Sequence, residues 1–93
     1  MTIYVDPLKH WGFTLKGKAR QTCHMVADTD AELHRMARRM GVNPAWYRRG
    51  EDSNQYRRHY EITAPFRHIV IRNGATPVSH QQLADMIREG TGP

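Results

Sequence analysis

Short runs rich in β-branched and aromatic residues recur along the chain, and they predict strands. They occupy residues 2–5, 23–27, 44–47, 59–62 and 75–78, with a further short strand expected at 13–15. The run at 23–27 feeds directly into a helical segment, as is typical of a buried strand. Residues 48–58 are polar and contain Gly50 and Asn54, so they predict an exposed loop.

The clearest helical pattern begins after Thr29. Thr29 and Glu32 fit a capping box, in which the Thr29 hydroxyl binds a first-turn amide and the Glu32 side chain reaches back to the Thr29 N–H. An apolar stripe at helical spacing follows, made of Leu33, Met36, Ala37 and Met40. Gly41 is placed to end this helix.

Two further helices are expected in the second half of the chain. Thr63 can cap a helix that begins at residues 64–65, because proline is tolerated in the first turn, and Gly74 ends it. Ser79 and Gln82 form a second capping box, which opens a helix that reaches Gly90.

This alternation of strands and helices predicts an α/β fold. We expect a single small domain over residues 1–90, followed by a flexible tail at 91–93. Right-handed crossovers favour a mostly parallel sheet of four or five short strands, with about three helices around it.

Composition narrows the class of protein. The longest apolar run is three residues, far short of the roughly 20 that a membrane helix needs. The single cysteine, Cys23, agrees with a reducing compartment, and residues 1–6 lack the pattern of a signal peptide, so we expect a cytoplasmic protein. Chains of this size bury a thin core, and a homodimer or a bound ligand would add stability.

The chain carries a net charge of +5, and most of its basic residues are arginines. Arginine suits bidentate contacts to phosphate and carboxylate groups. Many of the arginines fall between Arg35 and Arg58, which indicates either an anion-binding surface or a solvated basic face.

Several segments carry a resemblance to a known family: residues 2–6, 24–29, 32–34, 46–47 and 59–63, with Ala37, Gly41, Gly74, Ala75 and Val78. In this order and spacing the chain resembles an uncharacterised bacterial and phage family, domain of unknown function 4031, over most of its length outside the loops. Members usually carry Asp at the position of Glu61 and a Lys-Arg pair where this chain has Phe66 and Arg67. Arg67 alone keeps that charge. The resemblance implies a self-contained domain and does not indicate an activity.

Polar residues at strand ends suggest a site. In parallel α/β sheets, ligands bind beyond the carboxyl ends of the strands. Asp6, Asp28 and Thr63 each follow a predicted strand, so we expect them at one edge. Histidine is an effective acid or base near neutral pH. The candidate catalytic residues are Asp6, His24, His34 and His59. For each histidine the alternative is a half-buried structural role.

Phosphate binding is the chemistry best supported by the pattern. Thr63 at a helix start, with Arg67 one turn later, would offer backbone N–H groups and a guanidinium to an anion. Arg38 lies one turn beyond His34 along the same border of its helix. Asp28, Trp46 and Tyr60 complete the candidate ligand-binding residues, although Trp46 also fits a core anchor.

A metal site is a weaker alternative. Asp6, His24 and His59, joined by Asp28 or His34, would give a mixed histidine and carboxylate site for a divalent ion. The sequence has no H-E-x-x-H, C-x-x-C or H-x-H spacing, so a divalent metal is not favoured and the cofactor stays unassigned.

The leading hypothesis is therefore a small domain that binds a phosphorylated ligand, most simply a nucleotide, and acts as a hydrolase or transferase if it is an enzyme. A second hypothesis is a nucleic-acid-binding module that uses Arg48, Arg49, Arg57 and Arg58. A third is a phage or host accessory protein that binds an acidic protein partner through the same arginines.

Overall fold

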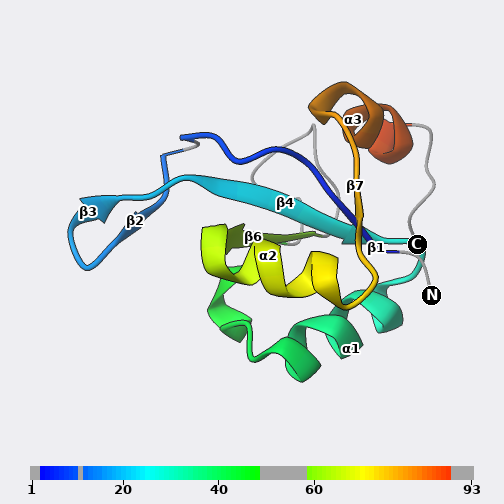
Figure 1. The fold of residues 1–93 in the computed structure, drawn as a ribbon, viewed down its shortest axis with the longest axis horizontal. Coiled ribbons are helices and arrows are strands. Elements are labelled where there is room, and N and C mark those ends of the chain that lie inside the picture. Colours follow the sequence, from blue (N-terminus) through cyan, green and yellow to red (C-terminus); the bar gives the residue numbers. More distant parts are fainter. Residues whose placement is uncertain (1–2, 11, 49–58, 89–93) are drawn as a thin grey trace.

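The computed structural model describes residues 3–10, 12–48 and 59–88 as three helices, a five-stranded sheet and a separate two-stranded hairpin (Figure 1). The elements in chain order are β1 (Ile3–Val5), β2 (Thr14–Leu15), β3 (Lys18–Ala19), β4 (Thr22–Ala27), α1 (Asp30–Met40), the 3-10 helix η1 (Pro44–Trp46), β5 (Tyr47–Arg48), β6 (His59–Thr63), α2 (Ala64–Arg72), β7 (Thr76–Pro77) and α3 (His80–Arg88). The predicted tail at 91–93 lies outside the described residues. The α/β class and the three helices are confirmed.

The sheet is mixed, so the prediction of a mostly parallel sheet is wrong. Its strand order is β5-β6-β4-β1-β7. Among the described residues, β4 pairs antiparallel with both β1 and β6, and β5 pairs antiparallel with β6. Parallel pairing joins β1 to β7, with Val5 opposite Pro77.

The antiparallel pairing of β1 with β4 follows from the connection between these two strands. A parallel neighbour requires a crossover, usually a helix, whereas this connection forms the β2–β3 hairpin that extends from one end of the sheet (Figure 1). A bridge between Lys9 and Thr22 begins the return, so β4 runs back beside β1. Strands joined in this way place their carboxyl ends at opposite edges.

The two faces of the sheet are covered differently. Helices α1 and α2 lie on one face and α3 on the other (Figure 1). The main core lies on the first face, where strand residues such as Met25 and Ile62 pack with Leu33 and Met36 of α1 and Val70 of α2. On the second face Val26 packs with Leu83 of α3. Alternation along β4 therefore sends Cys23 and Met25 to the main core and His24 to the α3 face.

The predicted helix starts at 29 and 79 are confirmed. The Thr29 hydroxyl accepts from the Glu32 amide and donates to the Glu32 carboxylate. At α3, Ser79 and Gln82 exchange both capping-box bonds. Gly41 ends α1 in the left-handed region, with φ of 75°.

Two local predictions need correction. Thr63 occupies the N-cap position of α2 but makes no side-chain capping bond. Residues 44–46 form η1 instead of a strand, because Asn43 caps that turn and Pro44 fits its first position, so that β5 begins at Tyr47. In the part of the chain that the structure describes, no helix is long and apolar enough to span a bilayer.

Candidate functional site

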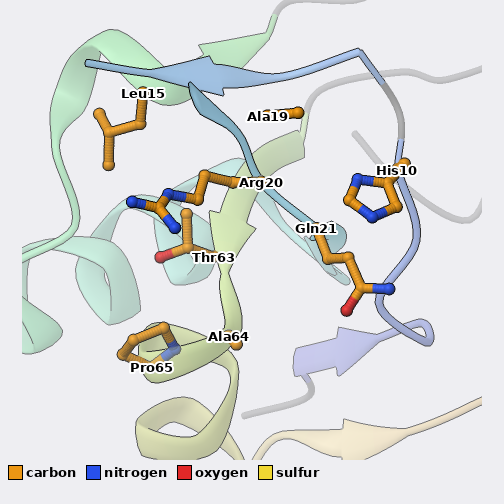
Figure 2. A pocket seen from close by; sticks show the side chains of 8 residues that line it. All are labelled: His10, Leu15, Ala19, Arg20, Gln21, Thr63, Ala64 and Pro65. Carbon is orange, nitrogen blue, oxygen red and sulfur yellow. The ribbon is translucent and has the colours of Figure 1, made fainter. Parts of the chain in front are cut away.

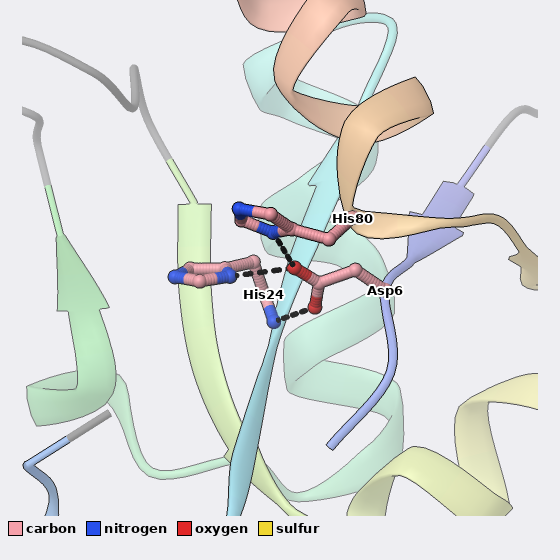
Figure 3. Close-up of side chains that lie close together, drawn as sticks. All are labelled: Asp6, His24 and His80. Carbon is pink, nitrogen blue, oxygen red and sulfur yellow. Dashed lines mark hydrogen bonds and ion pairs between the residues drawn. The ribbon is translucent and has the colours of Figure 1, made fainter. Parts of the chain in front are cut away.

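Asp6 joins two histidines that are far apart in the sequence (Figure 3). Asp6 follows β1, His24 lies in β4 and His80 begins α3. The His24 amide donates to Asp6 Oδ1 at 2.6 Å, and His24 Nδ1 lies 2.8 Å from Asp6 Oδ2. His80 Nδ1 reaches the same Oδ2 at 3.1 Å. One carboxylate thus holds two imidazoles.

Strand register explains this meeting. Val5 pairs with Met25 in the antiparallel ladder, so the next residue, Asp6, faces His24. Val5 also pairs with Pro77, and its carbonyl accepts from the Val78 amide. This pairing brings the capping box of α3, and with it His80, to the end of β1.

The Asp6 carboxylate is buried and charged. Asp6 is 0% exposed, whereas the His80 side chain keeps 32% of its surface in solvent. Burial alone would raise the pKa of Asp6, but hydrogen bonds from the His24 side chain and backbone, the charge on His24 and the bond from His80 together lower it. Behind the carboxylate, Arg67 Nε donates to the Asp6 backbone carbonyl at 2.9 Å.

The tautomer of both imidazoles follows from this charge. An ionised carboxylate only accepts hydrogen bonds, so each Nδ1 carries the proton that it donates to Asp6. When such a ring is neutral, its Nε2 is an acceptor. The Nε2 atoms of His24 and His80 both point away from Asp6, toward the same side (Figure 3). Such an atom can accept a proton.

His59 extends the cluster. Its ring meets the His24 ring edge-on, with the centroids 5.0 Å apart at 67°, and the residue is 5% exposed. The structure thus brings Asp6, His24 and His59 together, as expected from the sequence, and adds His80.

His34 lies elsewhere, on the α1 face of the sheet. Its Nδ1 is 2.7 Å from the Tyr60 hydroxyl and its Nε2 is 3.1 Å from Asp30 Oδ2, while the Tyr47 hydroxyl donates to Asp30 Oδ1. Tyr60 alternates with His59 along β6, so the two side chains face opposite layers. The expectation that His34 shares one cleft with His24 is therefore wrong.

Tyr60 has a perturbed phenol in this second cluster. Burial raises the pKa of Tyr60, the Asp30 charge raises it further, and Arg38 partly offsets them. Arg38 thus lies near Tyr60, on the face opposite His24. Its expected phosphate-binding role has no support from this placement.

A cavity of about 520 Å³ opens where the β2–β3 hairpin approaches the start of α2 (Figure 2). Its lining residues come from both segments: His10, Leu15, Ala19, Arg20, Gln21, Thr63, Ala64 and Pro65. Figure 2 shows the Arg20 guanidinium beside Thr63, with His10 and Gln21 on the other side. The lining contains no carboxylate among the described residues, so its charge is positive.

Thr63 and Arg67, expected to bind one phosphate together, separate in the structure. Thr63 lines the cavity, but Arg67 turns to the Asp6 carbonyl. Asp28 follows β4 at the opposite edge from Asp6, because Ala27 pairs with Ile3. The expected single edge therefore holds Asp6 and Thr63 without Asp28.

Trp46 packs as a core anchor. Its ring makes edge contacts with Phe13 and Phe66, at centroid distances of 5.5 and 5.6 Å. Of the four arginines proposed to bind nucleic acid, Arg48 ends β5, while Arg49, Arg57 and Arg58 lie outside the described residues. That surface stays a prediction.

Sequence reasoning missed His80 and Arg20. His80 is inside a recognised capping box, which signalled a helix start but not its partner. Arg20 follows the β2–β3 hairpin and reaches Thr63 only through the folded arrangement. The approach of Lys9 to Thr22 that places this segment has no local sequence signal.

The chain belongs to the family described as "Protein of unknown function (DUF4031)", which it matches over residues 3–90. No curated protein and no solved structure matches it.

Proposed function

We propose that this DUF4031 protein binds a phosphorylated ligand, most simply a nucleotide, with a phosphate in the cavity at the start of α2. The observation that carries this proposal is the Thr63 side chain. Thr63 is 9% exposed and lines the cavity, and its hydroxyl makes no hydrogen bond to any residue that the structure describes. A hydroxyl that has no protein partner at a cavity wall can bond to a ligand oxygen.

The surroundings of Thr63 suit an anion. Arg20 supplies a guanidinium, which forms strong charge-assisted bonds to phosphate. The first turn of α2 adds amides that have no partner within the helix, those of Ala64 and Phe66, together with the positive end of the helix dipole. Pro65 contributes no N–H but fixes the backbone of that turn.

The size and position of the cavity favour a ligand larger than phosphate. A volume of about 520 Å³ lies within the range of small-molecule sites. Thr63 pairs with Thr22, and His24 comes two residues later on the same face of β4, a step of about 7 Å. The Thr22 hydroxyl bonds to Glu61 on this face, which confirms the common orientation. A nucleotide would extend from the cavity toward the histidines.

The reaction class that fits is hydrolysis or group transfer at the end of the ligand that reaches the histidines. His59 or His24 would act as the acid or base, and Asp6 would orient His24. This step depends on ligand binding, which is tested first.

The test is calorimetric titration of the full chain with inorganic phosphate and with nucleoside mono-, di- and triphosphates. Arg20→Gln should weaken binding about tenfold or more, because it removes a charge-assisted bond. The matched control is Arg35→Gln, which removes the same charge from an exposed position on α1. An absence of binding, or equal weakening in both variants, would contradict a specific phosphate site.

A further inference from the structure

We infer that Asp6, His24 and His80 form a binding site for a divalent transition metal ion of the zinc class. This inference goes beyond the proposed function, and it is tested without a phosphorylated ligand. Among the described residues, these three offer one ligand atom each, and the atoms all lie within 4.8 Å of one another.

The spacing is close to that of a tetrahedral zinc site. Bonds of about 2.0–2.1 Å place neighbouring ligand atoms about 3.3–3.4 Å apart. His24 Nδ1 and His80 Nδ1 lie 2.8 and 3.1 Å from Asp6 Oδ2. A shift of roughly half an ångström would admit the ion. The proton on each Nδ1 would move to Nε2 as the neutral ring changes tautomer.

The donor set selects the kind of ion. Two imidazoles and one carboxylate suit Zn²⁺ and its first-row neighbours, whereas Ca²⁺ and Mg²⁺ require more oxygen ligands or several retained waters. Asp6 would bind the ion through Oδ2, the oxygen that faces both rings, while Oδ1 accepts from the His24 amide. Three protein ligands leave a fourth position for water or a ligand oxygen.

The surroundings hold the ligands in place and still leave an entrance. The edge-on contact with His59 fixes the plane of the His24 ring, and the Arg67 bond to the Asp6 carbonyl fixes the backbone of Asp6. Asp6 and His24 are buried, but the His80 side chain is 32% exposed. An ion can therefore reach the site past His80.

The experiment uses the untagged full chain, stripped with a chelator and kept in phosphate-free buffer. Titration calorimetry with Zn²⁺ should give one ion per chain, and Co²⁺ should give the intense visible bands of a tetrahedral site. His80→Ala and Asp6→Asn should each weaken Zn²⁺ binding about tenfold or more. His68→Ala, on the exposed side of α2, is the matched control and should leave the affinity unchanged.

His80→Ala decides the test if Asp6→Asn fails to fold, because His80 is partly exposed at a helix start. The inference is overturned if folded protein takes up no stoichiometric Zn²⁺. It is equally overturned if the His80→Ala variant binds Zn²⁺ as tightly as the His68→Ala variant. Phosphate binding can fail or succeed independently of either result.

Discussion

His80 Nδ1 lies 3.1 Å from Asp6 Oδ2, although 74 positions separate the two residues in the chain. This bond ties the start of α3 to the end of β1. It also adds to the two bonds that His24 donates to a carboxylate that is fully buried. The cluster therefore contributes to folding as well as to the chemistry proposed for it.

Replacing Asp6 should destabilise the fold in the absence of metal. Asp6→Asn removes the charge of the Asp6 carboxylate. This carboxylate accepts hydrogen bonds from the His24 amide, His24 Nδ1 and His80 Nδ1. Loss of charge-assisted bonds at a buried position costs about 2–3 kcal/mol. Urea unfolding of the chelator-treated protein measures this change. Asp28→Asn, at an exposed position, should change the free energy of unfolding by less than about 0.5 kcal/mol; similar losses in both variants would contradict the account.

Tyr60 gives the protein an alkaline pH dependence. The pKa of Tyr60 is raised above its ordinary value of 10.0, first by burial and then by the Asp30 charge. Between the two pKa values, the folded state keeps a proton that the unfolded state has lost. Stability should therefore fall as pH rises above about 10. The Tyr60→Phe variant should show a shallower decline, and an identical slope in both proteins would argue against a perturbed phenol.

The Thr63→Val variant should weaken phosphate binding without lowering the stability of the fold. The hydroxyl has no partner among the described residues, so its removal should leave stability unchanged or raise it by up to about 1 kcal/mol. Phosphate binding should weaken, because the ligand loses a donor. Thermal unfolding and calorimetric titration of the same preparations measure the two effects. A marked loss of stability would mean that the hydroxyl has a structural role.

Cys23 should be unreactive in the folded protein. It is 0% exposed, and burial, followed by the nearby Asp6 charge, raises its pKa to about 12. The thiolate is the reactive form, so labelling at neutral pH should follow opening of the fold. Labelling of native protein as fast as that of urea-unfolded protein would contradict this burial.

Local signals predicted the helices well. Thr29, the apolar stripe and Gly41 define α1 within the chain itself, because capping and helical periodicity involve neighbours in sequence. Ser79 and Gln82 did the same for α3. The direction of strand pairing was not predictable in this way, since β1 and β4 are distant in sequence and their antiparallel pairing depends on the β2–β3 hairpin that lies between them.

The candidate site was likewise predictable only as far as local sequence signals reach. The sequence places Asp6 after one predicted strand and His24 in another, and the antiparallel register of β1 and β4 brings them opposite each other. The position of His34 on α1 gave its angle around the helix but not the face of the sheet that α1 covers. His80 reaches Asp6 through the parallel pairing of Val5 with Pro77, for which the sequence has no local marker.

The most direct test of the account is an NMR titration of ¹⁵N-labelled protein with inorganic phosphate at constant ionic strength. We expect saturable shifts that are largest for the amides of Thr63, Ala64 and Phe66, and these shifts should be lost in Arg20→Gln but kept in Arg35→Gln. Shifts that do not saturate, or that are largest away from the start of α2, would contradict a phosphate site at this position.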